Sequence, residues 1–288
     1  MDRIGHVDAH LHLSQWWPDL AHTAYRADLD FTPAGLLREM DANGIDYGLV
    51  IQIPEGRDPA AALGESRAIV AAGGGRLRAV VTVDPTAGEE AVRAALALWE
   101  EETGIAGVKL FPGYLPFYPH DARLAPVYEF AHRRNLPVLV HQGDTLDRHG
   151  LVKFARPIEV DEVAVRYPDV RFVLCHFGNP WIEEAAELVY KNENVFADTS
   201  GLLPHPTAPY FARMLAQCRQ RLLNGIISIG AADRVLYGSD WPLEELGVAL
   251  RLVNDLDLPA PDRGRMLGEN ARRLFRLPDD PPPRTGSS

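Results

Sequence analysis

Histidines at the ends of apolar runs are the residues of this 288-residue chain whose types and spacing could do chemistry. The first run, His6-Val-Asp-Ala-His-Leu-His-Leu13, contains His10 and His12. Side chains alternate across an extended strand, so both imidazoles point to one face, where two adjacent polar rings are costly unless something binds them. Neutral imidazole is a preferred ligand of Zn²⁺ and related ions, and this spacing lets both rings reach one ion. For this motif alone, a hydrogen-bonded structural pair remains the alternative.

Three further apolar runs end in side chains of the same kind, namely His141, His176 and Asp240. About one β–α unit separates His141 from His176, and about two separate His176 from Asp240. Parallel strands of a barrel all end at the same rim, where barrel enzymes keep their active sites. The spacing therefore predicts that these residues join His10 and His12 in a metal centre.

Lys109 stands in another apolar run, Gly107-Val-Lys-Leu-Phe111. At the end of a strand, its amine could reach solvent, bind a substrate anion, or be carbamylated by CO₂ and bridge two metal ions. The residues themselves leave these three roles open.

Alternating strands and helices are expected to position these side chains. Strands are predicted at 6–13, 47–53, 77–83, 107–111, 137–142, 171–177, 195–199 and 235–239, and helices at 32–43, 60–72, 88–103, 124–135, 159–167 and 181–192. Eight strands in this alternation favour a closed, distorted (β/α)8 TIM barrel of the α/β class over an open sheet, and no Gly-x-Gly-x-x-Gly turn follows an early strand. We expect one barrel domain over residues 1–277 and a disordered, proline-rich tail over 278–288.

Composition limits the partners of this barrel. The chain carries 29 Lys and Arg against 40 Asp and Glu, a net charge of −11, which argues against nucleic acid or an anionic membrane as a partner. Its two cysteines, Cys175 and Cys218, are too few for a disulfide framework or a cysteine-based zinc site. No signal peptide and no membrane span is predicted. We expect a cytoplasmic protein that acts on a small molecule.

The ordered set Asp8-x-His10-x-His12, Lys109, His141, His176 and Gly238-Ser-Asp-Trp-Pro242 resembles the amidohydrolase superfamily, in particular its amidohydrolase-related branch of hydrolases and decarboxylases. The resemblance runs from His6 to Phe275. It implies a distorted barrel that binds a divalent metal, Zn²⁺ foremost and Mn²⁺ as the alternative, with His10, His12, His141 and Asp240 as ligands. Members with a carbamylated lysine hold two ions, whereas this branch often holds one, so the number of ions stays open. Members are often dimers, which leaves a homodimer open as well.

Two reactions fit this set. The leading expectation is hydrolysis of a small amide, ester or lactone by an activated metal-bound water, with Asp240 as metal ligand and general base. His176 then holds a second ion, the water or the developing oxyanion. The alternative implied by the resemblance is non-oxidative decarboxylation of a small aromatic or unsaturated acid, with His176 as the acid and base. A metal-binding or ligand-binding barrel without turnover is the third hypothesis.

Other residues are assigned by their position along the chain. Trp16, Arg26, Tyr114 and Trp241 lie in or beside the loops after strands, where substrate contacts are expected. Asp8 is expected to orient a ligand histidine. Cys175 has the opposite strand parity to His176, so we expect it to face the helices as an inert apolar side chain.

Overall fold

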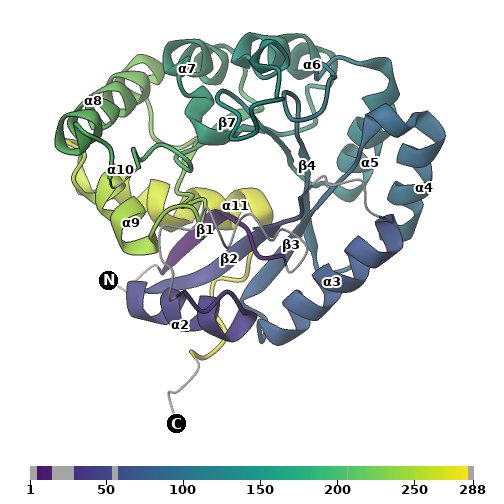
Figure 1. Cartoon of the computed structure of the whole chain (residues 1–288), viewed down its shortest axis with the longest axis horizontal. Coiled ribbons are helices and arrows are strands. Elements are labelled where there is room, and N and C mark those ends of the chain that lie inside the picture. Colours follow the sequence, from purple (N-terminus) through teal and green to yellow (C-terminus); the bar gives the residue numbers. More distant parts are fainter. Residues whose placement is uncertain (1–4, 15–28, 54–57, 206, 285–288) are drawn as a thin grey trace.

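The computed structural model describes residues 5–14, 29–53, 58–205 and 207–284 of the chain. Its eight strands form one parallel sheet in the order β1 to β8. They are β1 (His6–Leu11), β2 (Ile45–Ile51), β3 (Leu77–Thr82), β4 (Ile105–Leu110), β5 (Val138–Val140), β6 (Phe172–Leu174), β7 (Val195–Asp198) and β8 (Val235–Leu236). Figure 1 shows the helices arranged around this sheet. The structure thus confirms the predicted TIM barrel, which is nearly closed.

The first and last strands meet through few contacts. The backbone N–H of Ala9 donates to Tyr237 O at 3.0 Å, and that of Asp240 donates to His10 O at 2.8 Å. A single bridge pairs Leu11 with Trp241. Because β8 has only two residues, the chain around Asp240 follows the barrel edge without being part of a long strand.

The helices pack on the outside of the barrel. They are α2 (Pro33–Asn43), α3 (Pro59–Ala72), α4 (Glu89–Trp99), α5 (Ala125–Arg134), α6 (Asp161–Arg166), α7 (Ile182–Lys191), α8 (Phe211–Ile229), α9 (Leu246–Asn254), α10 (Ala260–Gly264) and α11 (Asn270–Phe275). All six helices expected from the sequence are present, with ends that differ by up to four residues. Helices α8 to α10 were not predicted. Much of α8 is exposed, and its buried residues are concentrated in its second half.

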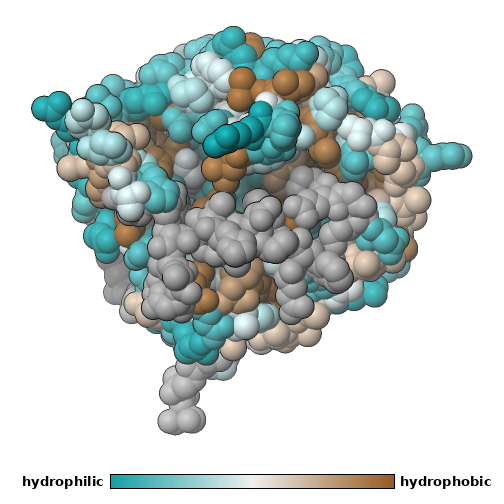
Figure 2. Space-filling view, viewed as in Figure 1, coloured by the Kyte–Doolittle hydropathy of each residue, from teal (hydrophilic) through white to brown (hydrophobic). Residues whose placement is uncertain are grey.

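Two apolar layers fill the fold. The outer layer lies between strands and helices, and the inner layer inside the barrel includes Leu49, Leu139 and Val173. Helix α11 closes one end, because its Leu274 and Phe275 belong to the inner layer. On the face shown in Figure 2, hydrophilic residues predominate over the described part of the surface. No described helix is both long and apolar enough to cross a membrane.

The segment after the barrel touches the closed end as far as residue 284. Arg284 Nη2 lies 3.1 Å from Asp46 Oδ1, and Tyr47 donates its hydroxyl to Asp280 O at 3.2 Å. Arg272 donates to Pro278 O at 2.8 Å. The disorder of 278–288 as a whole stays a prediction.

Candidate metal centre

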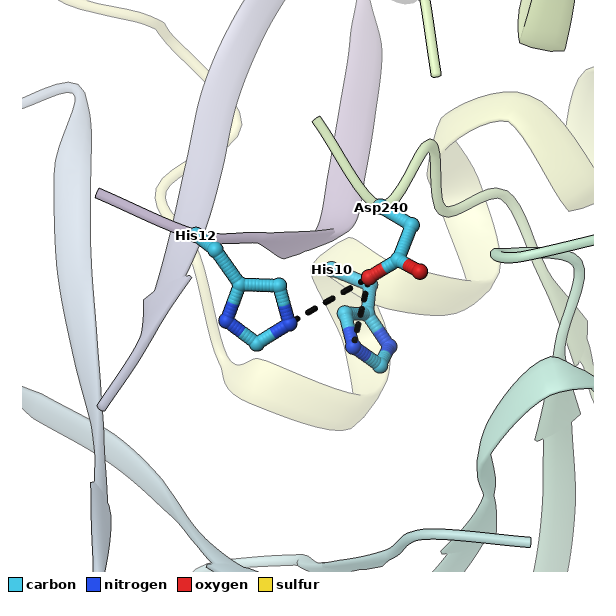
Figure 3. Close-up of side chains that lie close together, drawn as sticks. All are labelled: His10, His12 and Asp240. Atoms are coloured by element: carbon cyan, nitrogen blue, oxygen red, sulfur yellow. Dashed lines mark ion pairs between the residues drawn. The ribbon is translucent and has the colours of Figure 1, made fainter. Parts of the chain in front are cut away.

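Two histidines and an aspartate converge at the carboxyl ends of the first and last strands. His10 Nε2 lies 3.4 Å and His12 Nε2 lies 3.2 Å from the same atom, Asp240 Oδ1 (Figure 3). All three residues are buried and could together hold a metal ion. The sequence placed these residues at one rim, and the structure brings them within contact of one another.

Two further imidazoles complete the cluster. His141 follows β5 and His176 follows β6, and their facing atoms, His141 Nδ1 and His176 Nε2, are 3.1 Å apart. The ring of His176 is 4.9 Å from that of His10. Four imidazoles and one carboxylate therefore lie together at the rim, with His176 half-buried and the others buried.

Left-handed backbone turns direct two of these side chains. His176, Phe177 and Asp240 have φ angles of 60°, 43° and 62°. Strand β6 ends at Leu174, so alternation across the strand no longer applies to the residues that follow. The turn brings the side chain of His176 to the rim without forcing Cys175 to face the helices.

The expectation that Cys175 faces the helices is therefore wrong. Cys175 belongs to the inner apolar layer, and Lys109 Nζ donates to its Sγ at 2.9 Å. The parity argument failed because it extended strand β6 beyond its end. Lys109 is fully buried, so its amine does not reach solvent, and Nζ is 3.5 Å from His10 Nε2.

The contacts of His10 and His12 direct one nitrogen of each ring toward the same carboxylate oxygen. His10 Nδ1 lies 3.0 Å from Asp198 Oδ2, and His12 Nδ1 lies 3.3 Å from Ile51 O, while both Nε2 atoms face Asp240 Oδ1. Each ring therefore lies between two acceptors, but a neutral imidazole has only one N–H. Within the described part of the chain, buried Asp240 Oδ1 accepts no hydrogen bond. A cation between these atoms would remove the conflict, so the donor set fits a metal ion.

The pair formed by His141 and His176 leads to the same conclusion. His141 Nε2 lies 2.9 Å from Asp144 O, and His176 Nδ1 lies 3.2 Å from Ser200 O. A carbonyl oxygen only accepts, so each neutral ring places its proton on that nitrogen. The facing atoms, His141 Nδ1 and His176 Nε2, then turn lone pairs toward each other.

Burial keeps these rings neutral. It lowers the pKa of His10 to about 3, assisted by the positive charge of Lys109. Burial also lowers the pKa of His176, and it places the pKa of His141 well below the usual value. For Asp240, burial raises the pKa of the carboxyl, yet the contact with His12 more than offsets this and holds that pKa below the usual range. Neutral imidazoles beside an ionised carboxylate are the protonation states that a metal ion requires.

Two of the residues expected to bind substrate are described. The ring of Tyr114 stands edge-on to His141 at 4.8 Å, and its hydroxyl accepts from Leu146 N at 3.0 Å. Burial raises the pKa of Tyr114 to about 12. Trp241 is buried and packs against Phe31, with ring centroids 5.5 Å apart. Trp16 and Arg26 lie outside the described residues.

Residues after β7 contact this cluster and were missed by the sequence argument. Asp198 ends the strand, and Ser200 and Gly201 follow in the next turn. The signal was present, because Asp198 ends an apolar run as His141 and Asp240 do. Asp8, expected to orient a ligand ring, instead accepts the backbone N–H of His10, and it also accepts that of Ser239, each at 3.1 Å.

Comparison with known proteins adds context to this geometry. The model of a protein family described as "Amidohydrolase" matches residues 7–277. Gamma-resorcylate decarboxylase from Polaromonas sp. is 27% identical over an alignment that covers 39% of this chain and 36% of the relative. This chain thus spans about a third of that relative's length.

Two solved structures share the fold. A dihydroxybenzoic acid decarboxylase from Polaromonas sp., with bound manganese and the inhibitor 2-nitroresorcinol, is 19% identical with a TM-score of 0.69, covering 96% of this chain and 98% of the other. A probable 2-pyrone-4,6-dicarboxylic acid hydrolase from Acinetobacter baumannii, with citric acid bound, is 17% identical with a TM-score of 0.64, covering 94% and 99%. The named relatives are mostly decarboxylases of aromatic acids.

Proposed function

Because this chain belongs to the amidohydrolase family, we propose that it is a metal-dependent, non-oxidative decarboxylase of a small aromatic or unsaturated carboxylic acid. The proposal rests on one observation of the site. His176 stands beside the His10, His12 and Asp240 group, but its Nε2 faces His141 and not Asp240. The cluster thus offers both a place for a cation and a separate imidazole that can carry a proton.

The names of the relatives support decarboxylation over the hydrolysis that the sequence suggested first. Gamma-resorcylate, dihydroxybenzoic acid and 5-carboxyvanillate, the acids in their names, are aromatic carboxylates. In the described part of the rim, the aromatic ring of Tyr114 lies next to His141. An aromatic acid is therefore the substrate class that we propose.

His10, His12 and Asp240 would hold the metal, with His141 as a further ligand. When bound, a divalent ion supplies positive charge that neutralises a substrate oxygen and polarises the adjoining bonds. Histidine nitrogen with one carboxylate oxygen suits both zinc and manganese. We propose a single ion, because His10 Nε2 and His12 Nε2 both face the same atom, Asp240 Oδ1. Lys109 then stays an uncarbamylated amine beside Cys175.

His176 would move the proton of the reaction. Its Nδ1 lies against Ser200, so Nε2 is the atom that takes up a proton and gives it to the substrate carbon that bears the carboxylate. The carbon–carboxylate bond then breaks and its electron pair goes to the ring, which leaves CO₂ and a C–H bond. The burial of His10, His12, His141 and Asp240 limits the water that can compete for this proton.

Hydrolysis is the second candidate. One observation favours it, namely the shared fold with a probable 2-pyrone-4,6-dicarboxylic acid hydrolase. Asp240 Oδ1, buried and without a hydrogen-bond donor in the described part of the chain, would accept a proton from an attacking water. The two reactions use the same cluster and differ in the bond that breaks.

Release of CO₂ separates the two candidates. Protein loaded with Mn²⁺ or Zn²⁺ is incubated with a panel of hydroxylated benzoic acids and enoic acids, and with lactones, esters and amides. We expect CO₂ from at least one acid, and about a hundredfold loss or more in His176→Asn, which keeps a donor near the Nδ1 position and lacks Nε2. His132→Asn, at an exposed site on α5, is the matched control. Ring opening of a lactone without CO₂ release from any acid would replace this proposal by hydrolysis.

A further inference from the structure

The turn after β7 connects two imidazoles of the cluster through one buried carboxylate. Asp198 Oδ2 lies 3.0 Å from His10 Nδ1, and Asp198 Oδ1 accepts the backbone N–H of His176 at 2.9 Å. Asp198 Oδ1 also accepts the backbone N–H of Ser200 at 3.1 Å. Asp198 and Ser200 are both fully buried. The Asp198 carboxylate thus contacts both His10 on β1 and the backbone of His176 in the turn after β6.

The hydroxyl of Ser200 extends this connection. Its Oγ lies 2.5 Å from Asp198 Oδ1, so the hydroxyl proton lies between the two oxygens, because an ionised carboxylate can only accept. The same Oγ lies 2.9 Å from His10 Nδ1 and 2.9 Å from His176 Nδ1, and it shares the N–H of His176 with Ser200 O at 3.2 Å. With its proton given to Asp198, the oxygen has two lone pairs left, one for the N–H of each ring.

We propose that Asp198, through Ser200, is a positioning residue that keeps the protons of His10 and His176 on Nδ1, which leaves the Nε2 lone pair of His10 toward Asp240 and that of His176 toward His141. A ligand imidazole needs its second nitrogen held by an acceptor, since the position of that proton decides which nitrogen can bind metal. One carboxylate therefore prepares a metal ligand and the imidazole proposed as the acid. Only the role of His176 rests on the proposed function.

Asp198→Asn is the decisive variant because its effect on the tautomer is fixed by geometry. Oδ1 accepts two backbone N–H groups and the Ser200 hydroxyl, so the amide oxygen must occupy that position. The amide NH₂ then faces His10 Nδ1, and as a donor it requires a bare nitrogen there. The proton of His10 moves to Nε2, the atom that would bind the metal.

Long-range ¹H–¹⁵N spectra of histidine side chains in the metal-free protein measure this directly. In the wild type we expect Nδ1–H for His10 and His176. In Asp198→Asn we expect Nε2–H for His10 and Mn²⁺ binding about ten to a hundred times weaker. Because the spectra need neither metal nor substrate, they test this inference even if no acid is decarboxylated.

Ser200→Ala and Thr199→Val form a matched pair. Each removes a buried hydroxyl from the same turn, but within the described part of the chain Thr199 Oγ1 bonds to the backbone of Gly238 and not to an imidazole of the cluster. We expect Ser200→Ala to lower kcat about tenfold with KM unchanged, and Thr199→Val to leave both values within about twofold. These two variants still test the positioning role if Asp198→Asn does not fold. The inference is overturned if wild-type His10 carries Nε2–H, if Asp198→Asn binds Mn²⁺ as the wild type does, or if the two hydroxyl variants behave alike.

Discussion

Gly201 stands where any larger residue would displace His176. Its φ is +61°, and a Cβ atom at this position would lie 2.6 Å from His176 Nδ1 and 3.1 Å from Asp240 Oδ2. Ordinary van der Waals contact begins near 3.4 Å, so His176 would have to move by about 0.8 Å in Gly201→Ala. A misplacement of about 1 Å in a catalytic group costs on the order of a hundredfold in rate. We therefore expect kcat to fall about a hundredfold.

The same substitution also strains the backbone, and this effect can be separated. Alanine in the left-handed region costs roughly 1–2 kcal/mol. Gly230 is the matched control, because its φ is +76° and a Cβ there meets nothing within 4 Å. Both alanine variants should lose about 1–2 kcal/mol of unfolding free energy in denaturant titrations. Only Gly201→Ala should lose activity.

Activity and metal binding are measured on both variants. We expect CO₂ release to fall in Gly201→Ala, while its affinity for Mn²⁺ in calorimetry stays within about threefold of wild type, because His10, His12 and Asp240 form the short-contact group. Wild-type kcat in Gly201→Ala would refute the argument that the position of His176 controls the rate. An equal loss in Gly230→Ala would attribute the effect to strain alone.

Three other perturbations address the metal, a buried acid and the chain end. Replacing His10 and His12 together by Ala should abolish the binding of stoichiometric Zn²⁺ or Mn²⁺ in purified protein, and metal retained by the double variant would contradict the site. A hundredfold excess of free metal over Kd should stabilise the wild type by about 2.7 kcal/mol, and this stabilisation should be lost when the metal is removed. Burial raises the pKa of Glu244 well above its usual 4.5, with the charge of a neighbouring carboxylate adding to the shift. The folded chain therefore holds this proton more tightly than the unfolded chain, so the unfolding free energy of the metal-free protein should decline as pH rises above 4.5. The decline should be about 1–3 kcal/mol larger than in Glu244→Gln. Parallel curves of unfolding free energy against pH for the two proteins would count against the raised pKa of Glu244. Truncation after Leu277 removes the contacts of residues 278–284 with Asp46 and the closed end, and should lower the unfolding free energy by about 1–2 kcal/mol with kcat unchanged, whereas unchanged stability would agree with a disordered tail.

The sequence by itself determined the barrel and the residues gathered at its rim. Eight apolar runs alternating with helices leave few ways to bury both faces of a sheet, and a closed barrel brings the carboxyl ends of all eight strands to one circular rim. His10, His12, His141, His176 and Asp240 each follow or end such a run, so their convergence followed from the fold class alone. No side-chain detail was needed for that step.

Tertiary structure decided how each side chain at the rim is oriented and protonated. Alternation along a strand predicts direction only while the strand lasts, and β6 ends before Cys175, so the orientations of Cys175 and His176 depended on a left-handed turn that sequence parity could not include. The contact of Asp198 with His10 joins residues 188 positions apart in the chain, and no local pattern encodes it. Which nitrogen of an imidazole is left to bind metal is set by such distant acceptors. The identity of the candidate ligands is thus a local property of the sequence, whereas the orientation of their nitrogens is a property of the folded barrel.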